Sequence, residues 1–206
     1  MPAQSTTPLV ITLWETYGSN MEAVAAELSA RTGLPVHKQA YSSEDIEAEQ
    51  DDREKQGTLG QLMRSVIPFA VEAGDVTRTL IEGESGLRDL IEQNTAIVKD
   101  EAAQGGIILG RNGQFVLARR PNTLHVKLDG PVEARVANAA EASGITRDRA
   151  ASRQRIEDEF RSSLSTKTYR FDPRDNEYYD VVVNGAAMPP AAVVDIILAA
   201  KKAKLG

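Results

Sequence analysis

The sequence of 206 residues predicts an α/β fold with a mainly parallel sheet of about five strands and helices on both of its faces. Short apolar runs bounded by turn residues alternate with longer segments of helical period. One of these runs, residues 106–110 (GIILG), is continuously apolar, as is typical of a strand covered on both faces. The sequence contains no internal repeat and no low-complexity linker, so we expect one domain over residues 1–206.

The first half of the chain predicts two strands and four helical segments. In chain order these are a strand at 9–14, a helix at 21–31, a strand at 34–38, and three helices at 43–56, 59–70 and 87–98. Gly33 is a typical C-cap, Ser43 a plausible N-cap, and Pro68 is expected to bend or end its helix. The two strands are therefore separated from the rest of the sheet by a large helical insert, at about 43–102.

The second half predicts the remaining strands and the helices between them. The strands are expected at 106–110, 123–129 and 178–184, and the helices at 131–143, at 145–164 in one or two pieces, and from Pro189 onward. In open parallel sheets, ligands bind at the carboxyl ends of the strands. This rule places Glu15–Asn20, Arg111 and Asp129–Pro131 along one edge of the sheet.

Composition excludes several function classes. The net charge of −6 disfavours generic binding to nucleic acids, and the lack of cysteine excludes disulfides and thiolate metal sites. No apolar run approaches the roughly 20 residues that span a bilayer, and the polar start MPAQSTTP does not resemble a signal peptide. We therefore expect a cytoplasmic protein that binds neither membranes nor nucleic acids.

The loop after the first strand has the layout of a phosphate loop but lacks its reactive side chains. The complete motif, G-x-x-x-x-G-K-[ST], places a lysine on the phosphates and a hydroxyl on Mg²⁺. When Gly18 is aligned with this motif, Asn20 takes the place of the second glycine and Met21 that of the lysine. Because backbone N–H groups at a helix start do not depend on side chains, we still expect an anion to bind near Ser19 and Asn20. A carboxylate of Glu15 or Glu22 at that position would contradict this expectation.

Three segments give the chain a resemblance to the cytidylate kinase-like family of P-loop nucleoside monophosphate kinases. They are VITLWETYGSNMEAVAAELSARTGLP, GGIILGRNGQFVLARRPNTLHVKLDGPVEARV and YYDVVVNG. The resemblance covers nearly the whole length, and its middle segment is the most specific. It implies a three-layer P-loop fold, ATP as phosphoryl donor with Mg²⁺, and CMP or a related monophosphate as acceptor. It also implies that the helical insert binds the monophosphate and that an arginine-bearing lid, at about 146–170, closes over the phosphates.

The resemblance also implies roles for single residues. Arg111, Asp158 and Arg161 are identified as catalytic, with Arg111 on the acceptor phosphate and the other two in a D-x-x-R pattern of the lid. The implied nucleotide-binding residues are Tyr17, Gly18, Ser19, Asn20, Met21 and Arg153. No metal ligand is visible, and Phe160 stands where the family often has a further arginine. We expect Arg111 and Arg161 to converge on one cleft, although they are far apart in the sequence.

Three interpretations remain open at this level. The chain is either an active kinase or an inactive relative that binds a nucleotide or a protein partner through the inherited cleft. The third is a homodimeric scaffold built on the helices at 84–102 and 147–164. Each candidate arginine also has a structural alternative, since Arg111 could cap a carboxylate and Glu157–Arg161 could be an ordinary helical ion pair.

Overall fold

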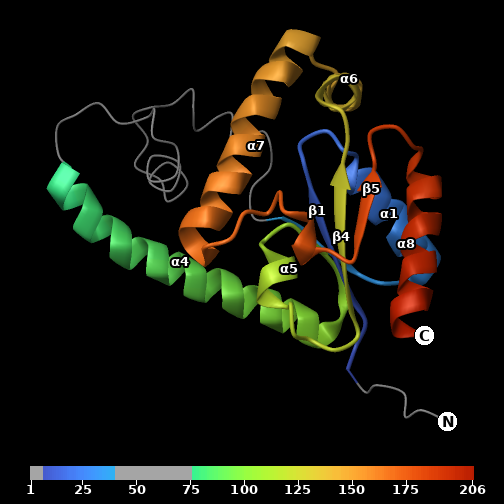
Figure 1. The fold of residues 1–206 in the computed structure, drawn as a ribbon, viewed down its shortest axis with the longest axis horizontal. Coiled ribbons are helices and arrows are strands. Elements are labelled where there is room, and N and C mark those ends of the chain that lie inside the picture. The colour runs from blue at the N-terminus through green and yellow to red at the C-terminus, as the bar shows by residue number, and fades with distance from the viewer. Residues whose placement is uncertain (1–6, 40–75) are drawn as a thin grey trace.

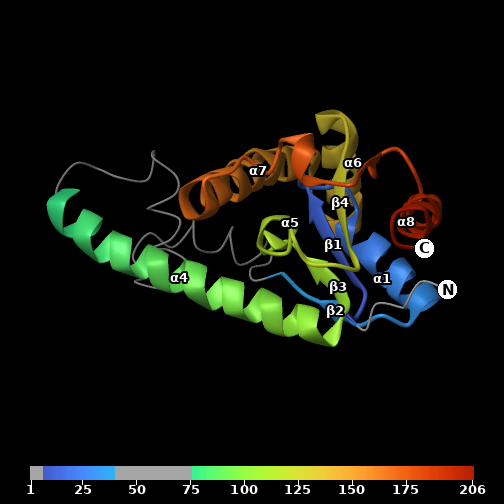
Figure 2. The same cartoon turned by 60° about the horizontal axis from the view of Figure 1, so that its bottom comes forward.

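A computed structural model describes residues 7–39 and 76–206, and for residues 76–87 it describes the backbone alone. Within these residues the sheet has five strands, all parallel, in the order β2-β3-β1-β4-β5 (Figures 1 and 2). The strands are β1 Val10–Glu15, β2 Val36–His37, β3 Gly106–Leu109, β4 Thr123–Asp129 and β5 Val181–Asn184. The predicted parallel α/β sheet is therefore confirmed.

Helices cover both faces of this sheet. They are α1 Met21–Thr32, α4 Val76–Gln104, α5 Gly113–Val116, α6 Val132–Ser143, α7 Arg147–Tyr169 and α8 Pro190–Leu205. The main core joins the central strands to α1 and α8, and a smaller cluster on the opposite face joins them to α4 and α5 (Figure 1). Helices α6 and α7 pack on each other at the carboxyl end of β4, so they border the edge where a ligand is expected.

Several boundaries differ from the sequence-based expectation. The helix expected at 145–164 is one piece and not two, and it begins at Arg147 in α7, whose N-cap Thr146 accepts a hydrogen bond from the Arg149 N–H. The last strand starts at Val181 and not at residue 178, because the chain first forms a 3₁₀ turn over Asn176–Tyr178, where Tyr178 packs edge-on against Phe171. The short helix α5 was not predicted, while the expected stripe at 87–98 lies within α4.

Two of the expected helices, at 43–56 and 59–70, lie outside the described residues. In the part of the chain that is described, no helix combines the length and the apolarity needed to cross a membrane.

Candidate functional site

Arg111 follows β3 in an unusual backbone conformation. Gly110, Arg111 and Asn112 all have positive φ angles, of 63°, 54° and 55°. Non-glycine residues rarely adopt this left-handed region, and such strain gathers at functional sites. The turn is fixed from two sides, because the Asn94 side chain donates to the Arg111 carbonyl (2.9 Å) and the Ser165 hydroxyl donates to the Asn112 side chain (2.6 Å). Arg111 is thus presented by a turn that α4 and α7 hold together.

A cleft of about 220 Å³ lies between these two helices, and we call it the α4–α7 cleft. Its floor is the end of β1, its rim is the turn carrying Arg111, and its walls are mostly apolar. The wall side chains include Leu90, Ile91 and Ile97 of α4 and Phe160, Leu164 and Tyr169 of α7. Arg111 and Arg161, fifty positions apart in the sequence, both line this cleft, which agrees with the expected convergence.

The two arginines differ in the number of hydrogen bonds and ion pairs that their guanidinium groups already make. Arg111 donates through Nε to the Lys38 carbonyl (2.9 Å), and contacts within the described residues leave its two terminal nitrogens without a partner. Arg161, whose side chain is 15% exposed, is paired twice, with Glu157 at 2.8 Å and with Glu15 at 3.5 Å, and it also donates to the Glu15 carbonyl at 3.0 Å. Arg111 is therefore the cation of this cleft that is available to a ligand.

Glu15 occupies the place that was expected to bind an anion. Its side chain turns back across the loop, and Oε2 accepts the Met21 N–H at the start of α1 at 3.0 Å. Burial raises the pKa of Glu15 above its usual value, against the opposing effects of Arg161 and of the Met21 N–H. Although burial alone would lower it, the charges of Glu157, Glu15 and Asp158 raise the pKa of Arg161, which stays protonated. The expectation of a free anion site at this helix start is therefore wrong for this structure.

The rest of the loop is packed against the protein. Gly18 has a φ of 83°, and a Cβ atom there would lie 2.2 Å from the Arg135 carbonyl oxygen. Ser19 is fully buried, and its carbonyl oxygen would lie 2.4 Å from a Cβ at Gly185. Asn20 adopts the left-handed conformation that a glycine would take (φ 67°), and its side chain donates to the Gly185 carbonyl at 3.0 Å. These contacts pack the loop tightly against α6 and against the segment that follows β5.

ATP with Mg²⁺ does not fit this loop. The Met21 side chain is 2% exposed and packs in the main core, so it supplies no charge where the motif has lysine. The N–H at the helix start is already bound by a carboxylate, which would repel a phosphate. Among the described residues, no group of three or more histidine or acidic side chains is placed to hold a metal ion. The side chains present therefore do not match the donor and cation that the resemblance implies.

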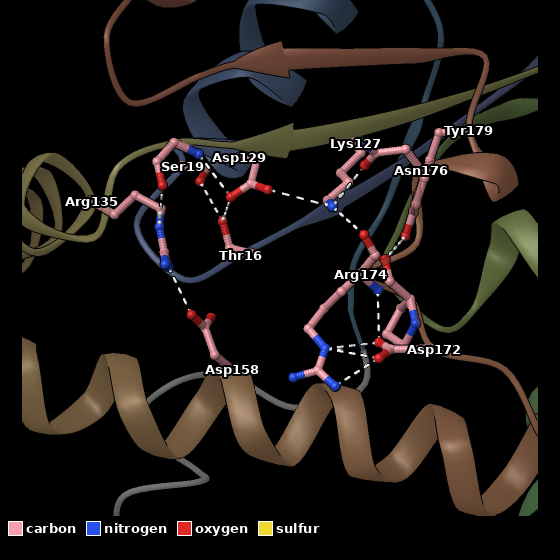
Figure 3. A network of polar contacts seen from close by, with 12 residues as sticks. Thr16, Ser19, Lys127, Asp129, Arg135, Asp158, Asp172, Arg174, Asn176 and Tyr179 are labelled. Carbon is pink, nitrogen blue, oxygen red and sulfur yellow. Dashed lines mark hydrogen bonds and ion pairs between the residues drawn. The ribbon is translucent and has the colours of Figure 1, made fainter.

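Asp158 points away from the α4–α7 cleft. Its Oδ1 accepts the Tyr17 N–H at 2.8 Å, and its Oδ2 pairs with Arg135 at 2.9 Å and accepts from Gln154 at 2.7 Å. It lines a second, polar cleft of about 580 Å³ between α7 and the ends of β1 and β4. On the floor of that cleft Thr16, Asp129 and buried Lys127 are linked by polar contacts, as Figure 3 shows.

The remaining candidates divide between the loop and α7. Tyr17 is buried with its ring against α6 and α7, and Arg153 is buried on α7 and lines neither cleft. Sequence reasoning missed Arg135, whose side chain contacts the loop, the turn after β4 and α7. Arg135 lies in the first turn of the helix that follows the Asp-Gly-Pro segment at 129–131. Because that segment faces the phosphate loop, this position is a signal that could have identified Arg135.

Comparison of the sequence with known proteins identifies one family over most of its length. The profile of the cytidylate kinase-like family matches residues 10–187. A cytidylate kinase of Ignicoccus hospitalis is 33% identical over 141 residues, which are 62% of this chain and 80% of that protein. A uronate isomerase of Corynebacterium glutamicum is 33% identical over 109 residues, which are 53% of this chain. The match spans only 21% of the length of that isomerase.

Solved structures support the fold. An uncharacterized protein from Eubacterium ventriosum superimposes with a TM-score of 0.65 at 15% identity, covering 94% of this chain and 98% of the other. A gluconokinase from Sinorhizobium meliloti gives a TM-score of 0.50 at 15% identity, covering 96% and 93%. At this level of identity the likeness establishes a kinase-like fold, and the ligand has to be argued from the site.

Proposed function

Because the chain belongs to the cytidylate kinase-like family, we propose that it binds a nucleoside monophosphate such as CMP in the α4–α7 cleft without efficient phosphoryl transfer from ATP. The observation that carries this proposal is the contact of the Glu15 carboxylate with both the Met21 N–H and Arg161. Phosphoryl transfer depends on positioning and on cations around the transferred group. Here the loop has no lysine, and the Glu15 carboxylate lies at the start of α1 instead. Arg161 of α7 is paired with two glutamates, which offset its charge.

The α4–α7 cleft retains features that suit a nucleotide. Arg111 offers a fork of donors of the kind that binds phosphate oxygens in pairs. The aromatic side chains of Trp14, Phe160 and Tyr169 line the same cleft and provide apolar surface for a base. A ligand with one phosphate at the rim and a flat ring within the cleft matches this distribution of charge and apolar surface.

Calorimetry tests the binding half of the proposal. Wild-type protein should bind CMP, and Arg111→Ala should weaken binding by roughly ten- to a hundredfold, since a charged hydrogen bond contributes about 1.5–3 kcal/mol. The matched control is Arg119→Ala, because Arg119 is exposed and has no contact with the other described residues. Absence of CMP binding, or equal losses in the two variants, would overturn the nucleotide assignment.

A coupled assay for ADP release tests the other half. Active kinases turn over at about 1–100 per second. Losing one well-placed electrostatic contact lowers the rate by about a hundred- to a thousandfold, so we expect turnover with ATP–Mg²⁺ and CMP well below one per second. Turnover within the ordinary range would show that Glu15 leaves the loop when ATP binds, and that the protein is an active monophosphate kinase.

A further inference from the structure

We propose that Arg135 and Asp158 are positioning residues that latch α7 onto the loop, so that the α7 wall of the α4–α7 cleft is held in place before the ligand arrives. The proposal rests on the nucleotide binding proposed above for that cleft. It concerns a step that precedes binding, namely the release of α7 from the loop. We call the contacts among Tyr17, Arg135 and Asp158 the latch.

The latch is a closed set of short contacts between three elements. Asp158 of α7 accepts the Tyr17 N–H at 2.8 Å and pairs with Arg135 of α6 at 2.9 Å (Figure 3). Arg135 also donates to the Tyr17 carbonyl at 3.0 Å and to the Gly130 carbonyl at 2.9 Å. Both polar groups of the Tyr17 backbone are thus bound by the same ion pair. The side chain of Arg135 is 5% exposed and that of Asp158 is 22% exposed, so water screens the pair only weakly.

The latch acts on the cleft through α7. Asp158 lies three positions before Arg161 on α7, and Arg161 binds the carbonyl of Glu15, two residues before Tyr17. Helix α7 therefore contacts the loop at two points, and Phe160 and Leu164 of the same helix form part of the cleft wall. Neither Arg135 nor Asp158 lines the α4–α7 cleft, so any effect of these residues on a ligand there has to be transmitted by the position of α7.

A latch of this kind has a kinetic signature. Association is slow when a wall of the binding site has to shift first, and a wall held in place also slows release. Breaking the latch should therefore accelerate both association and dissociation of CMP. A residue that only stabilised the fold would lower the melting temperature without changing the two rates together.

The experiment is stopped-flow fluorescence with CMP. Trp14, the only tryptophan in the sequence, is 6% exposed and lines the cleft, so it reports directly on ligand entry. In Asp158→Ala we expect both rate constants to rise about tenfold, because mutants of one site typically span one to three decades in rate. Arg135→Met should have the same effect, and the double variant should be no faster than Asp158→Ala, since both changes remove one shared contact.

The matched control is Arg155→Met. Arg155 is on the same helix, exposed, and without a contact to the other described residues, so its loss should leave both rates unchanged. Rates in Asp158→Ala within twofold of wild type, or additive effects of the two latch variants, would overturn the proposal. If Asp158→Ala does not fold, Asp158→Asn keeps an acceptor for the Tyr17 N–H, loses the charge, and should give a smaller increase in the same direction.

Amide exchange separates a failure of the latch from a failure of CMP binding. In Asp158→Ala the Tyr17 N–H loses its acceptor, so its exchange measured by NMR should accelerate at least tenfold while amides in β4 stay protected. This readout needs no ligand. Unchanged Tyr17 exchange would refute the latch even if CMP binds, and faster exchange without CMP binding would leave the latch standing and refute the nucleotide assignment.

Discussion

Replacing Glu15 with glutamine tests whether the loop is held by a charge or by a hydrogen bond. At 3.5 Å from Arg161, the carboxylate gains about 5 kcal/mol of attraction at an effective dielectric constant of about 20. Removing it from water opposes that gain by several kcal/mol. The pKa of Glu15 is raised, which means that the cost of burial outweighs the attraction and that this carboxyl ionises less readily in the folded protein than in the unfolded chain.

Glu15→Gln keeps an acceptor for the Met21 N–H and removes the charge. At pH 7.5 we therefore expect the free energy of unfolding to change by no more than about 1 kcal/mol, well below the 3–5 kcal/mol for breaking a net-favourable buried pair. Glu15→Ala leaves the Met21 N–H without its acceptor and should lose about 1–3 kcal/mol. Urea denaturation of wild type and both variants measures these differences.

The pH dependence of the free energy of unfolding tests the direction of the Glu15 pKa shift. For an acid whose folded pKa is raised, the contribution to stability is complete below the unfolded pKa, near 4.5, and is lost as the pH rises through the folded pKa. Between pH 4.5 and 7.5 the glutamine variant should therefore gain stability relative to wild type. A variant that loses more than about 3 kcal/mol at pH 7.5, or that becomes relatively less stable as the pH rises, would refute the reasoning.

Two further predictions concern the loop glycine and a buried histidine. Gly18→Ala should destabilise the protein by well over the roughly 1 kcal/mol expected from the positive φ alone, because its Cβ would meet the Arg135 carbonyl at 2.2 Å. Gly33→Ala is the matched control, with a φ of 71° and nothing within 4 Å, so the gap between the two variants in urea denaturation isolates the steric contact. Burial lowers the pKa of His125 to about 4, so its contribution to stability is complete above about pH 6.5 and is lost as the pH falls toward 4. His125→Gln should remove that acid-side loss, of roughly 3 kcal/mol for a shift of this size, and an unchanged pH profile of unfolding would contradict it.

The order of strands and helices was predictable because hydrophobic period and turn residues act locally. The 123–129 strand and the helix starting at Met21 agree with the structure, since each is bounded by a glycine, a proline or a cap within the same few residues. The strand at 178–184 was drawn too long because β-branched and aromatic residues there favour extended structure whether or not they pair. Only tertiary packing, of Tyr178 on Phe171, decides where pairing begins.

The site was predicted less completely. A family resemblance located Arg111 and Arg161, and the turn after β3 and helix α7 bring the two to the same cleft. The direction in which a carboxylate turns is not encoded in spacing, so the sequence names a Glu15 carboxylate at the helix start only as the outcome that contradicts an anion site. Asp158 was assigned to catalysis, whereas the structure places it on the Tyr17 backbone and Arg135. Its chemical role remains a prediction.

The close approach of the Arg135 backbone to Gly18 bears on how glycine patterns are used to find nucleotide sites. In this chain the glycine after the first strand is required by a neighbouring peptide group, independently of any bound molecule. A search pattern built on that glycine therefore detects a tight crossing of two chain segments. Assigning nucleotide chemistry to such a pattern requires a second kind of information, namely which group lies against the N–H at the start of the following helix.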